Sequence, residues 1–481
     1  MFNRPLLAIG FLLCGLAALE LVFAAADAVV ADANWRAFLI SGVMSGVIGA
    51  GLTSAFWSTS GDERQTDHRS AFILTAMSWT VLPLMASLPF YFSEIPVSFT
   101  DAVFETVSGI TTTGSTVIAG LDTLDPMLLL WRSVLQWFGG VGIIVMAIIM
   151  MPFLRIGGAQ LFQLESSART DGGVIARPMT LIRSIAALYA ALTMFCAAAY
   201  MLAGMSTFDA VNHAMTTLAT GGYSTHDASI GFFDSKAILW ASVVFMIAGA
   251  LPFMAYMRTM NGRPAALAED PQAPLFLVLL VGTWFIAAGF LAGEEAYLDK
   301  LLRAAVNITS VVTTTGYASE DYQLWGPGFV GLFFALTFVG GCAGSTSGGI
   351  KIYRFQLLRI FAAEHLRRLY SPSLVEVTSY GGVRLTREIA FSVLAFLSLF
   401  IGAFSLSALA LTFTGLDIAT ALSSSITALS NVGPGVGDIV GPAGNFASLP
   451  DAAKWILIAL MLLGRLELFA ILVMFDPYFW R

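Results

Sequence analysis

The sequence predicts an all-α polytopic membrane protein in which four pseudo-symmetric repeats surround a central pore, preceded by two extra transmembrane helices. Each repeat is predicted to contain a helix, a re-entrant half-helix and a second helix. Three observations predict this architecture: the apolar composition, the number of spans long enough to cross a bilayer, and one short motif that recurs four times along the chain.

The composition excludes an ordinary soluble protein. Hydrophobic residues make up 57% of the 481 residues and charged residues 11%. The mean hydropathy of +0.80 also lies far from that of soluble domains. The three cysteines, Cys14, Cys196 and Cys342, show no CxxC spacing, and the four histidines form no metal-binding pattern. A disulfide framework or a zinc site is therefore not expected.

The long apolar stretches predict membrane spans. Residues 5–26, 35–57, 71–92, 127–153 and 452–475 can each cross about 30 Å of hydrocarbon as a helix. The first stretch carries Glu20 and is soon followed by a second span, so we expect a retained helix rather than a signal peptide. The two leading helices are placed within residues 1–68.

The distribution of basic residues predicts the orientation of the chain. With the N-terminus inside, 17 of the 24 lysines and arginines fall on cytoplasmic segments. The other seven are Arg36, Arg132, Lys236, Lys300, Arg303, Lys454 and Arg465. We therefore predict a cytoplasmic N-terminus.

A single pattern occurs four times when the chain is aligned on four glycines, Gly114, Gly222, Gly316 and Gly433. An alanine stands twelve residues before each glycine, a small hydroxyl residue six before, and an apolar residue four before. The position nine before the glycine is always polar, and its residues are Glu105, His213, Asn307 and Ser424. Such agreement at fixed offsets indicates four repeats, which we place at 69–180, 181–268, 269–380 and 381–481.

Each recurring segment spans about a dozen residues, which is too short to cross a bilayer and predicts a re-entrant half-helix that ends in a loop. Irregular backbone at membrane depth is tolerated where it lines a cavity, so four such loops predict a pore. Inward-facing carbonyls around glycines are the ligands of a cation filter, and the half-helix dipoles favour a dehydrated monovalent cation there. The candidate ion-binding residues are Thr112, Thr113, Gly114, Thr220, Gly221, Gly222, Thr314, Thr315, Gly316, Asn431, Val432 and Gly433.

Two features depart from fourfold uniformity. Gly221 stands where the first and third loops have threonine, and the fourth loop reads Asn431-Val432-Gly433-Pro434. An ideal fourfold ring of carbonyls is therefore not expected.

A run of small and polar residues interrupts the second helix of the third repeat and predicts a movable intramembrane loop at 340–349. Its residues are Gly340, Gly341, Cys342, Ala343, Gly344, Ser345, Thr346, Ser347, Gly348 and Gly349. Arg465 lies inside the last predicted span, where an ionisable group is costly and indicates function, so we expect it to face the pore.

These motifs together resemble the Trk/Ktr superfamily of potassium transporters, in particular its TrkH/TrkG type, over nearly the whole chain. The resemblance implies that potassium is the transported ion, bound at the four loops, with no organic cofactor. It also implies that loop 340–349 is a gate and that Arg465 lies beneath the filter.

The resemblance further implies a homodimer in the bacterial inner membrane. It implies a cytosolic nucleotide-binding regulatory ring of the TrkA kind docked below the chain, which has no nucleotide-binding motif of its own. The basic stretch 351–368 is a candidate docking edge for this ring. Membrane lipid is the other expected partner, and nucleic acid is not expected to bind.

Several alternatives stay open at this point. Thr-Gly pairs can relieve helix packing, the glycine run can be a packed kink, and Arg465 can tie helices together through loop carbonyls. The chain can be an ion-coupled symporter that uses sodium or protons. A polytopic membrane enzyme is a further possibility, although few acid, base or metal groups fall inside the spans. A carrier of organic solutes would usually show two inverted repeats instead of four parallel ones.

Overall fold

The computed structural model describes residues 2–30, 34–57, 68–150, 178–372 and 378–481. Within these residues, seven helices are long and apolar enough to cross a membrane, or nine if each of two sharply bent helix pairs counts as one span. The prediction of a polytopic α-helical membrane protein is confirmed. The final residues of the predicted span 127–153 and part of the predicted repeat 69–180 lie outside the described residues.

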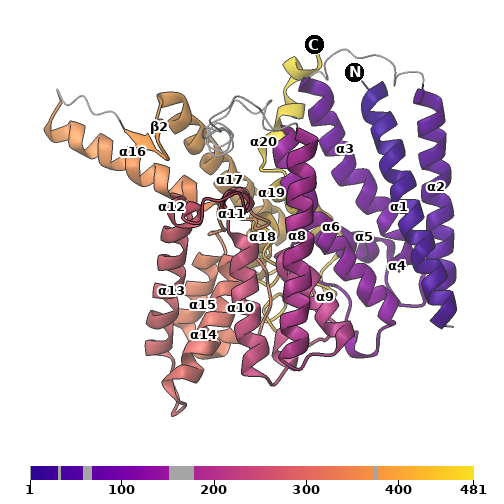
Figure 1. Ribbon diagram of the computed structural model, residues 1–481, viewed down its shortest axis with the longest axis horizontal. Helices are drawn as coiled ribbons and strands as arrows, with labels where there is room; N and C mark the ends of the chain where they lie inside the picture. Colours follow the sequence, from indigo (N-terminus) through magenta and orange to yellow (C-terminus); the bar gives the residue numbers. More distant parts are fainter. Residues whose placement is uncertain (1, 31–33, 58–67, 151–177, 373–377) are drawn as a thin grey trace.

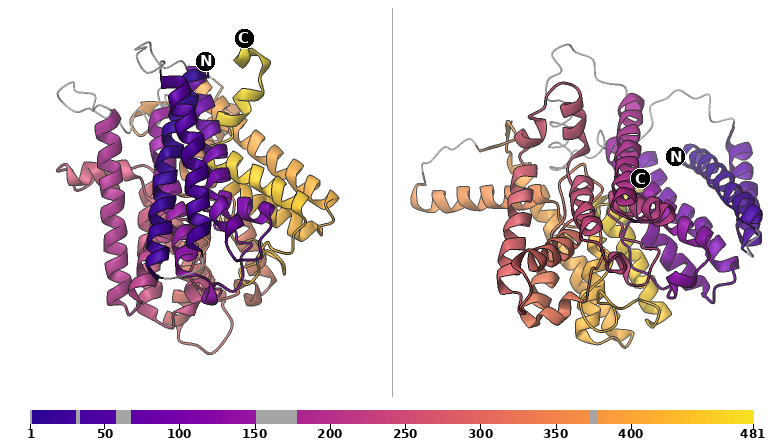
Figure 2. Two further views of the ribbon diagram at one scale, coloured as in Figure 1. Left: turned by 90° about the vertical axis from the view of Figure 1, so that its right-hand side faces the viewer. Right: turned by 60° about the horizontal axis from the view of Figure 1, so that its bottom comes forward.

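The first two helices form a hairpin at the edge of the bundle. They are α1 (Asn3–Val30) and α2 (Trp35–Phe56), which pack closely on each other and then on α3 (His68–Ala86) and α4 (Leu88–Phe92). Figure 2 shows the pair standing side by side on the outside of the molecule. Phe23 and Phe38 from this hairpin meet Trp131 in edge-on ring contacts, which join the hairpin to the rest of the protein.

In the rest of the chain, four helices of 12 to 16 residues, called the short helices below, lie between the other helices (Figure 1). The short helices are α5 (Phe99–Ile110), α9 (Thr207–Leu218), α14 (Tyr297–Val312) and α18 (Ile418–Ser430). The flanking helices are α6 (Pro126–Met150), α8 (Pro178–Leu202), α10 (Lys236–Ala250), α11 (Phe253–Met260), α12 (Ala266–Glu269), α13 (Ala273–Phe290), α15 (Pro327–Leu336), α16 (Ile352–Tyr370), α17 (Arg387–Phe413), α19 (Asp451–Arg465) and α20 (Phe469–Leu472).

Short elements complete the description. The single-turn 3₁₀ helices are η2 (Leu121–Thr123), η3 (Ser229–Phe232), η4 (Tyr322–Trp325), η5 (Val473–Phe475) and η6 (Pro477–Trp480). The strands β1 (Ser379–Tyr380) and β2 (Val383–Arg384) form an antiparallel hairpin. This hairpin is a small exception to the all-α prediction.

The stretch 452–475, predicted as one continuous span, is broken. Helix α19 ends at Arg465, and the segment Phe469–Phe475 leaves it at 104°. Glu467 and Leu468 at the break both have positive φ, 54° and 55°. The break gives each polar side chain a partner, because Arg465 bonds backbone carbonyls while Glu467 pairs with Arg354. Helices α10 and α11 form a similar bend of 92° that the sequence analysis did not predict.

Two hydrophobic cores hold the short helices in place. One core joins residues of α8, α9, α10, α13 and α14, and the other joins residues of α5, α6, α18 and α19 with Phe23 and Phe38 of the first hairpin. The third repeat therefore packs with the second, and the fourth with the first. This arrangement brings the ends of all four short helices toward the middle of the bundle.

Candidate functional site

The four short helices end in loops with the same backbone conformation. The residue two before each glycine has positive φ: 52° at Thr112, 50° at Thr220, 58° at Thr314 and 54° at Asn431. Each aligned glycine is also left-handed, with φ between 75° and 105°. In every loop the residue just before the glycine donates its N–H to the carbonyl six residues before the glycine, at 2.8–3.0 Å. Threonine at positive φ is unusual and costs roughly 1–3 kcal/mol, so the surrounding packing must hold these loops in place.

The four glycines face one another's loops in a closed ring. A Cβ added to Gly114 would lie 2.1 Å from the carbonyl oxygen of Gly221, and one on Gly222 would lie 1.9 Å from that of Thr315. A Cβ on Gly316 would lie 2.2 Å from the carbonyl oxygen of Val432, and one on Gly433 would lie 2.8 Å from that of Thr113. Each glycine therefore lies against the residue that precedes the aligned glycine of the next loop. The fourth loop contacts the first in the same way, which closes the ring. Only glycine fits this close approach.

The four glycines also line one cavity of about 80 Å³. Its wall continues through Ser115, Tyr223 and Ser224 to His226 and Asp227. His226 donates a hydrogen bond to Asp122 at 2.6 Å, which holds the pKa of that carboxyl below its usual range. The cavity therefore has backbone at its base and acidic groups near its rim.

In three of the four repeats, the polar residue nine positions before the glycine hydrogen-bonds the segment that follows the loop. Glu105 accepts from the N–H of Val117 at 2.9 Å, and His213 Nε2 bonds the hydroxyl of Ser224 at 2.9 Å. The third repeat uses Asn307, which bonds the N–H and the hydroxyl of Ser319 at 3.1 and 2.8 Å. In the fourth repeat Ser424 is too short and bonds its own helix, at Thr420 O.

The residue after the glycine joins neighbouring repeats, a role that the sequence analysis missed. Tyr223 donates its hydroxyl to the carbonyl of Glu105 at 2.7 Å, and Tyr317 reaches the carbonyl of His213 at 3.2 Å. Ser115 donates to the carbonyl of Gly433 at 2.9 Å. The sequence shows a tyrosine directly after two of the four glycines. Only the structure shows that the hydroxyl of each tyrosine hydrogen-bonds the preceding repeat.

A buried ion pair behind the first two loops was also missed. Arg132 Nε lies 2.8 Å from Glu105 Oε1, with side chains 1% and 0% exposed. The same guanidinium donates to the carbonyl of Ser224 at 2.9 Å and lies 4.1 Å from the ring centre of Tyr223. Arg132 was counted as an outward-side basic residue, and its distance along the chain from Glu105 concealed the pairing.

The departure at Gly221 has a direct physical reason. Gln136 donates its amide to the Gly221 carbonyl at 2.7 Å and accepts from the N–H of Tyr223 at 3.1 Å. A Cβ at Gly221 would lie 2.5 Å from Gln136, so threonine does not fit. In the fourth loop, the Gly433 carbonyl accepts from Ser115 and Thr427. The ring is closed but its carbonyls are not equivalent.

Loop 340–349 lies directly against the inner side of the ring. Gly348 donates its N–H to the hydroxyl of Thr314 at 2.7 Å, and Ser347 donates to the carbonyl of Thr313 at 2.8 Å. Thr346 bonds the carbonyls of Leu218 and Gly249 at 3.0 and 2.9 Å. The loop therefore contacts the second and third loops through side chains that the sequence analysis had assigned to the filter and the gate.

The start of the same loop is pinned to α10. Cys342 donates its N–H to the carbonyl of Ala250 at 3.0 Å, and the carbonyl of Gly344 accepts from Phe253 at 3.0 Å. Gly340 donates its N–H to the carbonyl of Ile350, and Ile350 donates its N–H to the carbonyl of Phe338, across the base of the loop. A Cβ on Gly348 would lie 2.2 Å from the carbonyl of Ser430, so the loop also abuts the fourth repeat.

Arg465 lies under this loop, at the last residue of α19 rather than inside a continuous helix. Its Nη1 donates to the carbonyl of Thr346 at 2.9 Å, and its Nη2 approaches the carbonyl of Gly139 at 3.4 Å. The side chain is buried, and its Nε has no hydrogen-bond partner among the residues that the structure describes. Arg465 therefore ties loop 340–349 to α6 and places a cation beneath the ring.

The described part of the chain contains no group of three His, Cys, Asp or Glu side chains suited to hold a metal ion. The ring itself is built from backbone, hydroxyl and amide groups, without a carboxylate among its twelve candidate residues. A cation there would be held by dipoles, as expected for a permeating monovalent ion.

A helical membrane bundle with non-helical loops meeting at its centre is the architecture of membrane transport proteins. The family described as "TrkH: Cation transport protein" matches residues 36–269 and 292–480. The chain belongs to this TrkH family of cation transport proteins. The membrane-enzyme alternative is therefore excluded.

Relatives and a solved structure agree with this membership. The Trk system potassium uptake protein TrkI of Halomonas elongata is 46% identical over 417 residues, covering 85% of this chain and 84% of that protein. TrkH of Escherichia coli K12 is 37% identical, covering 94% and 93%. The crystal structure of the potassium transporter TrkH from Vibrio parahaemolyticus superposes with a TM-score of 0.90, at 34% identity and full coverage of both chains.

Proposed function

We propose that this protein carries potassium across the bacterial inner membrane through the ring formed by its four loops. The observation that carries the proposal is the closed series of close approaches from each glycine to the next loop's carbonyl, 1.9–2.8 Å for an added Cβ. Such a ring presents carbonyl oxygens around one axis, where they replace the hydration shell of an ion. The relatives named as potassium uptake proteins support potassium as the ion.

Charge around the ring favours a cation without trapping it. The C-terminal ends of α5, α9, α14 and α18 carry partial negative charge and meet at the ring. No fixed carboxylate stands among the ring residues to hold the ion too tightly. The inequivalent carbonyls of Gly221 and Gly433 support moderate rather than extreme selectivity.

Loop 340–349 acts as the gate in this proposal, and its contacts with the ring support a closed position. The loop fills the space on the inner side of the ring and bonds Thr313 and Thr314 there. Arg465 holds it through Thr346 O. Opening requires these bonds to break together.

The partners and orientation belong to the same proposal. We place the N-terminus in the cytoplasm, the chain in a homodimer, and a nucleotide-binding regulatory ring of the TrkA kind on the cytoplasmic face. Within the stretch 351–368, Lys351 and Arg354 are buried, so docking would use the exposed Arg359, Arg367 and Arg368. A dependence of uptake on a sodium or proton gradient would instead make the chain an ion-coupled symporter.

Alanine substitution of the ring glycines tests the proposal. A methyl at Gly222 would meet Thr315 O at 1.9 Å, whereas one at Gly433 would meet Thr113 O at 2.8 Å. Overpacking of this kind costs roughly 1–3 kcal/mol of stability and displaces the facing carbonyl, so potassium-over-sodium discrimination should fall. We expect G222A, G114A and G316A to lose more discrimination than G433A, measured as competing uptake into liposomes.

The matched control is Gly289→Ala in α13, where an added Cβ meets nothing within 4 Å. This variant should keep the wild-type ratio of potassium to sodium uptake. If correctly inserted G222A, G114A and G316A all kept that ratio too, the loops would not be the filter.

Shortening the gate is expected to raise flux while leaving ion preference unchanged, because the filter and not the gate selects the ion. Deleting residues 345–347 removes the contacts of Thr346 and Ser347 with neighbouring elements. The milder Thr346→Val removes one hydroxyl, whose proton is shared between Leu218 O and Gly249 O and whose oxygen accepts from Thr220. At roughly 0.5–1.5 kcal/mol for the donated and the accepted bond each, potassium flux should rise about five- to 150-fold.

Ser345→Ala is the control for the gate variants, since its hydroxyl bonds only Cys342 O within the same loop. It should leave flux near the wild-type value. Lower flux in folded Thr346→Val protein would contradict a gating role for this loop.

A further inference from the structure

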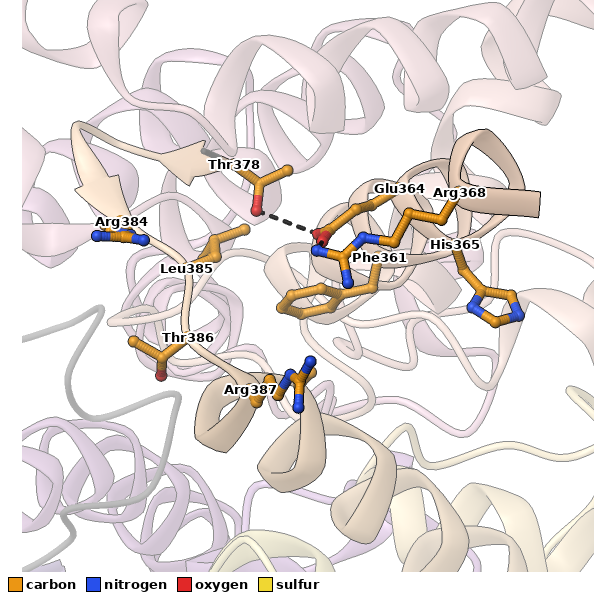
Figure 3. A pocket seen from close by; sticks show the side chains of 10 residues that line it. Phe361, Glu364, His365, Arg368, Thr378, Arg384, Leu385, Thr386 and Arg387 are labelled. Carbon is orange, nitrogen blue, oxygen red and sulfur yellow. Dashed lines mark hydrogen bonds and ion pairs between the residues drawn. The ribbon is translucent and has the colours of Figure 1, made fainter. Parts of the chain in front are cut away.

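A preformed basic pocket lies far from the ring, between α16, the β-hairpin and α17. It has a volume of about 270 Å³. Figure 3 shows that its arginines come from three elements: Arg368 from α16, Arg384 from β2 and Arg387 from the first turn of α17. Figure 1 places this region on the side of the molecule that carries both termini.

The pocket has an excess of positive charge that its own residues do not neutralise. Its lining holds three arginines, one glutamate and His365, which gives a net charge of +2 with the histidine neutral. Glu364 is occupied by Arg368 at 2.5 Å and by the hydroxyl of Thr378 at 3.2 Å. Within the described parts of the chain, Arg384 and Arg387 make no ion pair.

The walls of the pocket are fixed by a small hydrophobic cluster. Tyr353, Leu357, Tyr380, Leu385 and Ile389 pack together with Val393 where α16, the hairpin and α17 meet. The hydroxyl of Tyr380 also donates to the side chain of Gln356 on α16 at 2.5 Å. The arginines therefore stand on a rigid base, which lowers the entropy lost when an anion binds.

One rim of the pocket continues into an exposed apolar surface of α17. Arg387, Phe391 and Leu394 follow each other at i, i+4 and i+7, so they share one face of α17. Phe391 is 70% exposed and Leu394 is 51% exposed on a helix long and apolar enough to span the membrane. A ligand bound at Arg387 would thus contact the polar pocket on one side. On the other side it would contact the apolar side chains of Phe391 and Leu394, called the apolar track below.

We propose that this pocket binds the phosphate group of an anionic phospholipid, with the acyl chains along Phe391 and Leu394. Guanidinium groups bind phosphate through paired N–H donors, which suits Arg384 and Arg387. The position at the first turn of a spanning helix matches the headgroup layer. The apolar track distinguishes a lipid from a soluble phosphate. The site is independent of potassium transport.

The test measures lipid binding to the purified full-length protein, with phosphatidylglycerol as the probe and native mass spectrometry as the readout. Each arginine near an anionic surface contributes about 1 kcal/mol, or about five-fold in affinity, so Arg384→Gln with Arg387→Gln should lose about 25-fold. The double lysine variant R384K/R387K keeps the charge but loses the paired N–H donors, so it should bind more weakly than the wild type and more tightly than the double glutamine variant. Arg359→Gln is the control, since Arg359 is exposed on α16 but does not line the pocket.

Two outcomes would overturn the proposal. Equal loss of phosphatidylglycerol in Arg359→Gln and in the double glutamine variant would show nonspecific attraction to basic residues. Displacement of the lipid by excess inorganic phosphate, with the same dependence on Arg384 and Arg387, would show a soluble-anion site. The readout is lipid binding and not potassium flux. If the lipid proposal fails, the proposal that the ring carries potassium is unaffected, and the reverse also holds.

Discussion

Arg132→Met is expected to destabilise the protein by about 3–5 kcal/mol, because it leaves the carboxylate of Glu105 buried without its charge partner. The pair is 2.8 Å apart and both side chains are buried. Glu105 also holds the N–H of Val117, so an unpaired charge there would disturb the chain leaving the first loop. Thermal unfolding of the purified protein in detergent measures the loss.

The double variant Glu105→Gln with Arg132→Met tests whether the lost stability comes from the unpaired charge of Glu105 or from the lost arginine side chain itself. Glutamine keeps an oxygen for the Val117 N–H and carries no charge, so much of the lost stability should return. Lys236→Met is the control, because Lys236 and Asp299 also form a pair at 2.5 Å but Lys236 is 70% exposed. Such a surface pair contributes about 0–1 kcal/mol. Equal destabilisation by Arg132→Met and Lys236→Met would contradict a structural role for the buried pair.

The fold class and the four loop glycines could be predicted from the sequence because each depends on local signals. Apolar length predicts spans, and the offsets are constant since each half-helix ends three or four residues before its glycine. The left-handed φ of Gly114 and Gly222 agrees with the reason given for glycine there. The same alignment also marked the position nine before the glycine as polar, although its partners were unknown.

Contacts between distant elements could not be predicted in this way. Gly139 on α6 and Gly464 on α19 lie against the ends of α5 and α18, where an added Cβ would be 1.9 Å from Ile110 O and 2.0 Å from Leu429 O. They stand at different distances along the chain from their loop glycines, so no fixed offset reveals them. The break after Arg465 was missed for a related reason. Its cause is the partners of Arg465 and Glu467, which lie far away in the sequence.

Under the proposed function, Arg465 would oppose ion passage in two ways. It lies under the ring, and it holds the gate through a 2.9 Å bond to Thr346 O. Its positive charge also repels a permeating cation. At about 4 Å two like charges repel by roughly 1 kcal/mol in bulk water and by about 4 kcal/mol at an effective dielectric near 20. The larger value corresponds to about a thousandfold lower ion occupancy.

Arg465→Gln should therefore raise potassium flux, by up to about a thousandfold at the upper limit of the charge effect. Arg465→Lys keeps the charge and one donor, so flux should stay low. Lys454→Gln is the control: Lys454 is a buried cation paired with Asp101 at 2.6 Å, away from loop 340–349, and its loss should lower stability without raising flux. Flux through each purified variant in potassium-loaded liposomes decides between the roles. If Arg465→Gln abolished insertion or flux while Arg465→Lys restored both, Arg465 would be a structural tie between α19 and the loop, and not a barrier to the ion.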